Sequence, residues 1–270
     1  MLLNLTPSGH ELQRKMLLEH SSIIRTIFIC SLVLLILVPL CVGLLFSKYS
    51  AELEDDFMCN VAKIEVYSAD YLTGNSGISQ GTAFLIANLD GSTDGYMLTA
   101  RHVITQAVSE KVNLTFPYLS TDDDNELEAT ASIIWKTDVD WDGSDVNTLR
   151  YDVALLKLDD SVALPEYVSG FKLGETINVK QNVSIYGFPE GEEYAQDGQI
   201  ASTSFKETDD LFILSFDIAP GMSGAPVYDE EAGEVLGIAI GHGNDLQRIC
   251  ISIKRILELM DQDGVKNLID

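Results

Sequence analysis

The sequence predicts an all-β domain that follows a single membrane-spanning helix. Two observations lead to this prediction. One uncharged apolar run lies near the N-terminus, and many short apolar stretches separated by Gly, Asn and Asp turns come after it, with little helical periodicity between them. At 270 residues, the chain has room for a membrane segment and roughly 200 residues of folded domain. That is enough for one large all-β unit or two small barrels.

The membrane helix is predicted at residues 26–46, where 21 consecutive residues carry no charge. A run of this length spans a bilayer as one helix. A signal peptide fits less well, because the run is too long and no small-residue cleavage site follows before Lys48; a buried core helix is the remaining alternative. Lys and Arg are denser before the run than just after it. This places residues 1–25 in the cytoplasm and the folded domain outside it, on the periplasmic side of the inner membrane.

Short β-strands are predicted throughout the chain after an acidic linker at residues 47–56. The predicted strands are residues 61–67, 80–87, 96–104 (ending in a short helical turn), 111–116, 127–136, 152–158, 183–188, 200–205, 211–217, 226–228 and 235–240. Residues 118–126 and 137–150 are acidic and are predicted as long surface loops. A closing helix is expected at residues 253–262, where apolar residues recur at helical spacing.

The net charge of −25 is concentrated in the predicted domain. Residues 1–50 contain four Lys or Arg and two acidic residues, a charge of +2, which leaves −27 for residues 51–270. Such a field repels nucleic acid and favours cationic partners. The alternative is that the acidity serves solubility or adaptation to salt.

The cysteines do not suggest a metal site. Cys30 and Cys41 lie in the apolar run, whereas Cys59 and Cys250 lie in the predicted domain. Outside the cytoplasm the latter two could form a disulfide, and the alternative is two buried thiols. No C-x-x-C motif or His/Cys cluster is present, so neither a metal nor another cofactor is expected.

The strongest candidate site is residues 220–227, Pro-Gly-Met-Ser-Gly-Ala-Pro-Val. Gly221 can adopt torsions that a side chain forbids. The N–H groups of Gly221 and Ser223 can then converge and form an oxyanion hole beside a nucleophilic hydroxyl. The alternative is an ordinary tight turn, since Gly, Pro and Ser are common turn residues.

Ser223 has two candidate partners elsewhere in the chain. His102 follows a predicted strand, and Asp152 directly precedes another. A carboxylate at such a position can orient an imidazole, which in turn can act as the base for a serine. Each residue alone could be a strand-end or capping residue. The chain order His, Asp, Ser excludes an α/β-hydrolase esterase, in which the serine comes first.

The surroundings of these three residues resemble a known family. LTARHV around His102, DVALLKL around Asp152 and PGMSGAPV around Ser223 resemble the chymotrypsin-like (trypsin-fold, PA clan) serine proteases. The closest likeness is to the bacterial HtrA/DegS-type and glutamyl-endopeptidase-like branches, without a PDZ domain. QGTAFLIA, VSIYGFPEG and GEVLGIAIG resemble further strands of the same branch. The resemblance implies two perpendicular six-stranded β-barrels with the active site in the cleft between them.

The resemblance also implies a role for each motif residue. His102 would be general base and then general acid, Asp152 would orient it, and Ser223 would form an acyl-enzyme. The backbone N–H groups of Gly221 and Ser223 would bind the oxyanion. Met222 replaces the aspartate that pairs with a freed N-terminus in the digestive enzymes, so no activation by N-terminal cleavage is expected.

Substrate-binding residues are less clearly encoded. Asp217 lies six residues before Ser223, and in trypsin-like members an acid at that offset selects Arg or Lys at the base of the primary pocket. The alternative is that Asp217 ends its strand and faces solvent. Ile240 and Gly241 resemble the strand edge that pairs with substrate backbone. His242 could line the pocket, but the simpler interpretation is that it is a turn residue. Arg101 stands where many relatives have a small residue.

These predictions combine into a membrane-anchored serine endopeptidase that acts on polypeptides. Its domain would cover residues 57–270, with the first barrel at about 57–165 and the second at about 175–252. The alternative is a catalytically weak or inactive trypsin-fold protein that binds peptides or regulates a partner.

Overall fold

The structure is a computed structural model, and it describes residues 57–69, 76–88, 92–105, 107–121, 125–139, 145–241 and 248–269. The predicted cytoplasmic segment, membrane helix and linker (residues 1–56) lie outside these residues. Among the helices that are described, none has both the length and the apolar character needed to cross a membrane.

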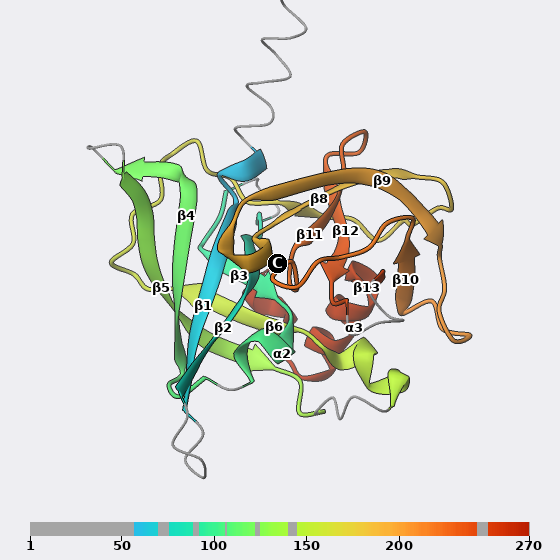
Figure 1. The fold of residues 1–270 in the computed structure, drawn as a ribbon, viewed down its shortest axis with the longest axis horizontal. Coiled ribbons are helices and arrows are strands. Elements are labelled where there is room, and N and C mark those ends of the chain that lie inside the picture. Colours follow the sequence, from blue (N-terminus) through green and yellow to red (C-terminus); the bar gives the residue numbers. More distant parts are fainter. Residues whose placement is uncertain are drawn as a thin grey trace, which may run out of the picture. The chain divides into compact units, whose positions relative to one another are not determined.

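Six antiparallel strands form a first closed barrel in the order β1-β2-β3-β6-β5-β4 (Figure 1). The strands are β1 (Val61–Ala69), β2 (Ser76–Leu85), β3 (Tyr96–Thr99), β4 (Lys111–Thr121), β5 (Asn125–Lys136) and β6 (Ala154–Leu158). In β1, Ile64 and Val66 are buried whereas Lys63 and Glu65 are partly exposed. This alternation follows from the two-residue period of a strand with one buried face.

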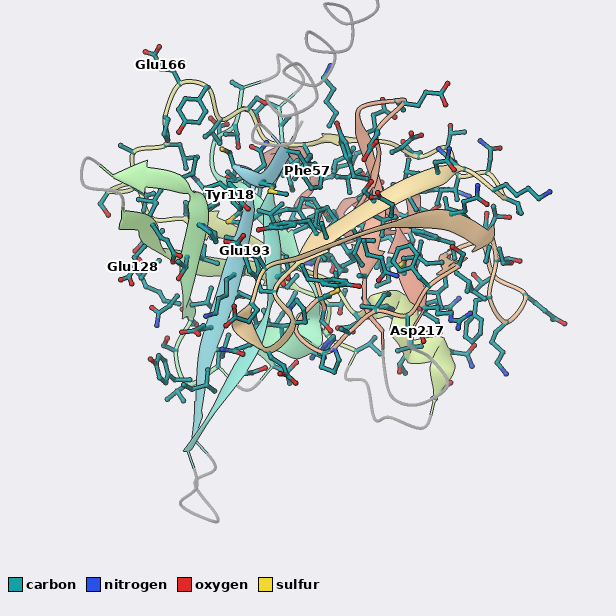
Figure 2. The ribbon with its side chains drawn as sticks, turned by 45° about the horizontal axis from the view of Figure 1, so that its top comes forward. Phe57, Tyr118, Glu128, Glu166, Glu193 and Asp217 are labelled. Carbon is teal, nitrogen blue, oxygen red and sulfur yellow. The ribbon has the colours of Figure 1, made fainter. Side chains whose placement is uncertain are left out.

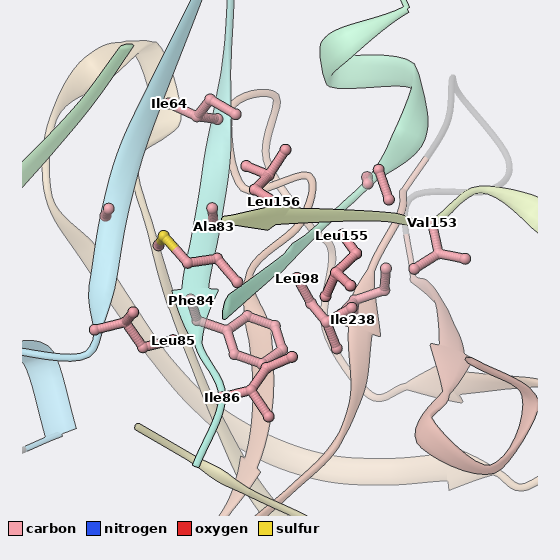
Figure 3. Close-up of a cluster of buried hydrophobic side chains, with 14 of the residues drawn as sticks. Ile64, Ala83, Phe84, Leu85, Ile86, Leu98, Val153, Leu155, Leu156 and Ile238 are labelled. Atoms are coloured by element: carbon pink, nitrogen blue, oxygen red, sulfur yellow. The ribbon is translucent and has the colours of Figure 1, made fainter. Parts of the chain in front are cut away.

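A second closed barrel has the order β11-β8-β9-β10-β13-β12, with β11 pairing to β12. Its strands are β8 (Asn182–Gly187), β9 (Tyr194–Ser202), β10 (Leu211–Leu214), β11 (Pro226–Asp229), β12 (Glu234–Ala239) and β13 (Ile249–Ser252). The short strand β7 (Lys172–Leu173) adds parallel to β12. The apolar core of the first barrel continues onto β12, where Ile238 lies near Leu98 and Leu155 (Figure 3).

The chain closes with helix α3 (Ile253–Gln262). The Ser252 hydroxyl caps its first turn by accepting from the N–H of Arg255 at 3.2 Å. Ile253, Ile256 and Met260 are buried on one face. Among the described residues, shorter helical turns include α2 (Arg101–Ile104), η1 (Val146–Tyr151), η2 (Pro189–Gly191) and η3 (Lys266–Leu268). Two six-stranded antiparallel barrels and a C-terminal helix confirm this part of the predicted fold.

The first residues of the domain pack into an aromatic cluster. The ring of Phe57 lies 5.0 Å from Phe171 and 4.8 Å from Tyr228, centroid to centroid. Tyr186 joins the cluster at 6.3 Å from Phe57, and burial raises the pKa of its hydroxyl. Tyr118 lies at the edge, where its hydroxyl donates to the carboxylate of Glu193 at 2.8 Å (Figure 2). Strands of both barrels thus hold the start of the domain.

The prediction of a long acidic loop at residues 118–126 is wrong. Strand β4 continues to Thr121 and β5 begins at Asn125, and these two residues are paired. A register shift between Phe116 and Ser120 separates this outer part of the hairpin from the barrel. The apolar alternation that marks a half-buried strand is lost beyond this shift. Strand β9 is also polar and lacks an apolar alternation at its start, so it begins before the predicted strand at residues 200–205.

The two cysteines of the domain are buried thiols and do not form a disulfide. The thiol of Cys59 donates to the carbonyl of Tyr118 at 3.4 Å. Burial raises the pKa of the Cys250 thiol well above its ordinary value. The second of the two alternatives drawn from the sequence is therefore correct.

Candidate active site

Strand pairing brings His102 and Asp152 to the same end of the first barrel. Strand β3 ends at Thr99, just before the helical turn α2 that carries His102. Asp152 follows η1 and precedes β6. Because Thr99 pairs with Ala154 across the β3–β6 ladder, the two flanking side chains meet beyond the strand ends.

His102 and Asp152 contact each other twice. The ring Nδ1 of His102 lies 2.6 Å from Oδ2 of Asp152, and the backbone N–H of His102 donates to Oδ1 at 2.8 Å. Asp152 is 3% exposed, whereas 26% of the His102 side chain is exposed. An ionised carboxylate only accepts hydrogen bonds, so Nδ1 carries a proton. In the neutral ring, Nε2 is then the atom that can accept one.

The segment before Ser223 is a tight turn. The N–H of Met222 donates to the carbonyl of Ala219 at 3.1 Å, and Gly221 has φ +96°. Pro followed by Gly at the two central positions is the preferred sequence of a type II turn, which requires positive φ at the second position. A Cβ on Gly221 would also lie 2.4 Å from the carbonyl oxygen of Phe188. No other residue type fits this position without movement of the backbone.

The residue after Ser223 packs directly against the end of strand β3. Gly224 has φ +90°, and a Cβ at this position would lie 2.0 Å from the carbonyl of Thr82 and 2.5 Å from Oγ1 of Thr99. Its N–H donates to the carbonyl of Ala239 at 2.7 Å. This close approach brings the serine segment to the barrel end that carries His102.

Thr82 on strand β2 fixes two carbonyls of the serine segment. Its N–H donates to the carbonyl of Ser223 at 2.8 Å, and its hydroxyl donates to the carbonyl of Gly221 at 3.0 Å. The same hydroxyl accepts from the N–H of Phe188 at 3.3 Å. Thr82 is fully buried. The sequence analysis assigned no role to Thr82, and the only signal is a lone hydroxyl in the apolar stretch QGTAFLIA.

Met222 anchors the turn from the other side. Its side chain is fully buried and belongs to the apolar cluster of the second barrel, with Val183, Ile185 and Leu214 among its members. An apolar side chain therefore occupies the position where the digestive enzymes have an aspartate. Arg101, the other departure from the family pattern, is also buried at 7% exposure.

The candidate substrate-binding residues have different environments. Asp217 lies on the exterior of the protein (Figure 2), where its carboxylate accepts from Nε of Arg248 at 2.5 Å. The two side chains are 58% and 52% exposed, respectively. Ile240 is buried and its N–H donates to the carbonyl of Ile249 at 3.1 Å. Gly241 is partly exposed beside it, and His242 lies outside the described residues.

Within the part of the chain that the structure describes, no group of three or more His, Cys, Asp or Glu side chains is placed to hold a metal ion.

The fold and the site define a class of protein: a two-barrel β protein with a His–Asp pair at one end of the first barrel, where the backbone of the glycine-flanked serine segment also packs. The trypsin-like peptidase domain family matches residues 81–238, more than half of the chain. The match includes His102, Asp152 and Ser223. The chain belongs to this family.

Solved structures share the fold. One is the inactive form of a serine-to-alanine mutant of Rv3671c from Mycobacterium tuberculosis, with 18% sequence identity and a TM-score of 0.50. The similarity covers 77% of this chain and 88% of that one. At this identity the likeness concerns the fold alone. Among curated proteins, none matches the sequence significantly.

Proposed function

We propose that this chain is a serine endopeptidase that hydrolyses peptide bonds through an acyl-enzyme. The observation that carries the proposal is the His102–Asp152 contact of 2.6 Å at the barrel end against which Gly224 packs. We also propose that a helix at residues 26–46 anchors the protein in the inner membrane, with the peptidase domain in the periplasm. This part rests on the sequence alone.

In the proposed reaction, the Ser223 hydroxyl attacks the scissile carbonyl while Nε2 of His102 takes its proton. Asp152 stabilises the imidazolium that forms, and the N–H groups of Gly221 and Ser223 bind the oxyanion. The imidazolium then protonates the leaving amine, and the peptide C–N bond breaks. Water, deprotonated by the same imidazole, hydrolyses the ester and restores the serine.

The anchoring of the serine turn supports activity without N-terminal cleavage. Thr82 holds the turn by hydrogen bonds and Met222 holds it by burial. Neither group depends on a new N-terminus. We therefore propose that the peptidase is competent as synthesised.

An exposed pair at Asp217 bears on substrate preference. A Lys or Arg side chain of the substrate would compete with Arg248 for the Asp217 carboxylate. A pair between the substrate and Asp217 would also be exposed, and exposed ion pairs are weak. This favours at most a modest preference for basic residues.

A fluorophosphonate probe tests the proposal. The full-length protein in detergent should become labelled, and mass spectrometry of its peptides should place the adduct on Ser223. Heat-denatured protein should stay unlabelled, and an excess of a cleavable peptide should slow the labelling. An adduct at another serine, or no adduct, would refute the assignment. Tight binding of unfolded polypeptides without cleavage would instead support the inactive peptide-binding alternative.

Gly221→Ala is expected to lower kcat by about 10²–10³-fold, the usual effect of losing one oxyanion donor. The new Cβ would lie 2.4 Å from the carbonyl of Phe188, so the turn must shift. Steady-state kinetics on a peptide substrate measures the effect. Gly264→Ala is the matched control, because Gly264 has φ +73° with no atom within 4 Å of a new Cβ. This control should lose about 1–2 kcal/mol of stability and keep its kcat. Equal kcat losses in both variants would contradict the prediction.

A further inference from the structure

Two guanidinium groups lie over the ring of Tyr151, the residue before Asp152. The Cζ atom of Arg150 is 5.2 Å from the centroid of the Tyr151 ring, and that of Arg255 is 5.1 Å away. Arg150 belongs to η1 in the middle of the domain sequence, whereas Arg255 belongs to α3 near its C-terminal end. A cation within about 6 Å of an aromatic face is attracted by the ring.

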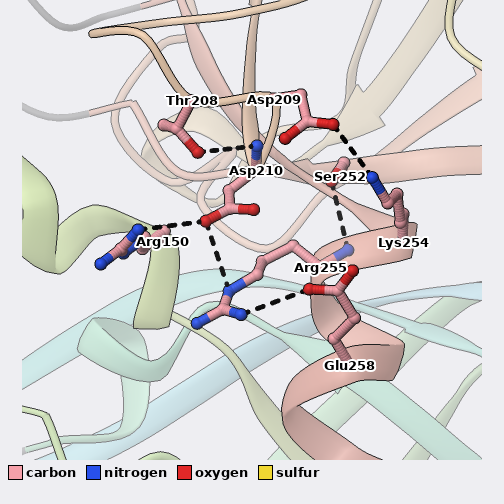
Figure 4. Close-up of polar contacts among 8 residues, drawn as sticks. All are labelled: Arg150, Thr208, Asp209, Asp210, Ser252, Lys254, Arg255 and Glu258. Carbon is pink, nitrogen blue, oxygen red and sulfur yellow. Dashed lines mark hydrogen bonds and ion pairs between the residues drawn. The ribbon is translucent and has the colours of Figure 1, made fainter.

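One carboxylate holds both guanidinium groups (Figure 4). Oδ2 of Asp210 lies 3.4 Å from Nη1 of Arg150 and 3.6 Å from Nε of Arg255. Glu258 adds a second acid, 3.4 Å from Nη1 of Arg255. Asp210 precedes strand β10 of the second barrel, and its carbonyl accepts from the N–H of Ser252 at 2.9 Å. The network therefore joins η1 to the second barrel and to α3.

Two members of this network, Arg255 and Asp210, are largely shielded from water. The side chain of Arg255 is 10% exposed and that of Asp210 is 17% exposed. Burial strengthens ionic and cation–π contacts and penalises a cation that has lost its partner. The two arginines are balanced by the two acids, so the cluster is neutral as a unit.

The backbone at Asp152 has little regular structure of its own. Asp152 has φ −83° and ψ 62° and lies between η1 and β6. Its N–H donates to the carbonyl of Leu149 at 3.1 Å, while the carbonyl of Tyr151 accepts from the Thr137 hydroxyl and from the N–H of Val153. Asp152 directly follows Tyr151, so a shift of Tyr151 would move the carboxylate.

We propose that Tyr151 is a positioning residue for Asp152, and that Arg255 and Asp210 act through it. The two guanidinium groups over the Tyr151 ring fix the peptide bond before Asp152. The carboxylate of Asp152 is thereby placed to contact both the ring and the backbone N–H of His102. This inference rests on the proposed peptidase function. A small displacement of a catalytic group is sufficient to lower a rate by orders of magnitude.

Tyr151→Leu and Arg255→Met are expected to lower kcat by about 10-fold or more, with KM within twofold of wild type. Tyr151→Phe keeps the ring face and should retain wild-type kcat. Lys254→Met is the control on the same helix, since Lys254 forms its ion pair at the surface with Asp209 at 2.9 Å, with side chains 48% and 72% exposed. It should leave kcat unchanged.

These measurements separate positioning from mere support of the fold. Wild-type kcat in Tyr151→Leu and Arg255→Met, even with a lowered melting temperature, would overturn the inference. So would an equal loss of kcat in Tyr151→Phe. If Tyr151→Leu does not fold, Arg150→Met provides the readout, because 37% of that side chain is exposed; a kcat loss of at least threefold is expected, and wild-type kcat would overturn the inference. An inactive wild-type protein would refute the peptidase function itself, and this inference with it.

Discussion

Replacement of Ser223 by alanine is expected to lower kcat on a peptide substrate by about 10⁶-fold, the loss typical of removing a serine nucleophile. Without the hydroxyl no acyl-enzyme forms, and His102 has no proton to remove. Ser223 is 7% exposed and its carbonyl accepts from the N–H of Thr82. Alanine keeps this backbone contact. The melting temperature should therefore change little.

The Ser223→Ala experiment distinguishes loss of chemistry from loss of structure. Fluorophosphonate labelling should disappear together with cleavage, while binding of an uncleaved peptide persists. The residual rate should come only from the oxyanion site and from binding. Cleavage that survives the substitution, after contaminating peptidases are removed by a second purification, would show that another group is the nucleophile.

Asp152→Asn is expected to lower kcat by about 10⁴-fold. The carboxylate accepts from two His102 donors, the backbone N–H at 2.8 Å and the ring at 2.6 Å. An asparagine has only one acceptor oxygen at this position. The backbone N–H cannot change and keeps that oxygen, so the amide NH₂ faces the ring. Nδ1 must then accept, the proton moves to Nε2, and Nε2 can no longer take the proton of Ser223.

The measurement is kcat with matched checks of folding. Thermal melting should show a folded Asp152→Asn protein, since the amide is nearly isosteric with the carboxylate. Asp209→Asn is the control, because it removes the charge of an acid on the surface that pairs with Lys254. Its kcat should equal that of wild type. A loss in Asp152→Asn below about 10-fold would indicate that Asp152 does not set the tautomer of the ring.

The sequence was most informative where chemistry requires a particular residue type. Glycines on both sides of Ser223 and a lone acid before an apolar strand were visible as patterns. Strand alternation predicted an all-β domain, and the family resemblance implied its two barrels. Thr82 was not predicted, because the groups it fixes are backbone carbonyls, which every residue has. The contacts among Tyr151, the two arginines and Asp210 join three separate segments of the chain, so no local sequence pattern indicates them. The ends of strands in polar regions were predicted at the wrong residues, because these parts of the strands have no buried face and so show no apolar alternation.

Burial of Met222 has a consequence for the pH range of the proposed peptidase. In the digestive relatives, the pairing of an aspartate with a free α-amino group depends on a group that loses its proton at a pH of about 8. Here a thioether in an apolar pocket and a threonine hydroxyl hold the turn, and neither ionises in water at accessible pH. We therefore expect this anchoring to be independent of pH, so that other parts of the protein set the upper pH limit of the proposed peptidase.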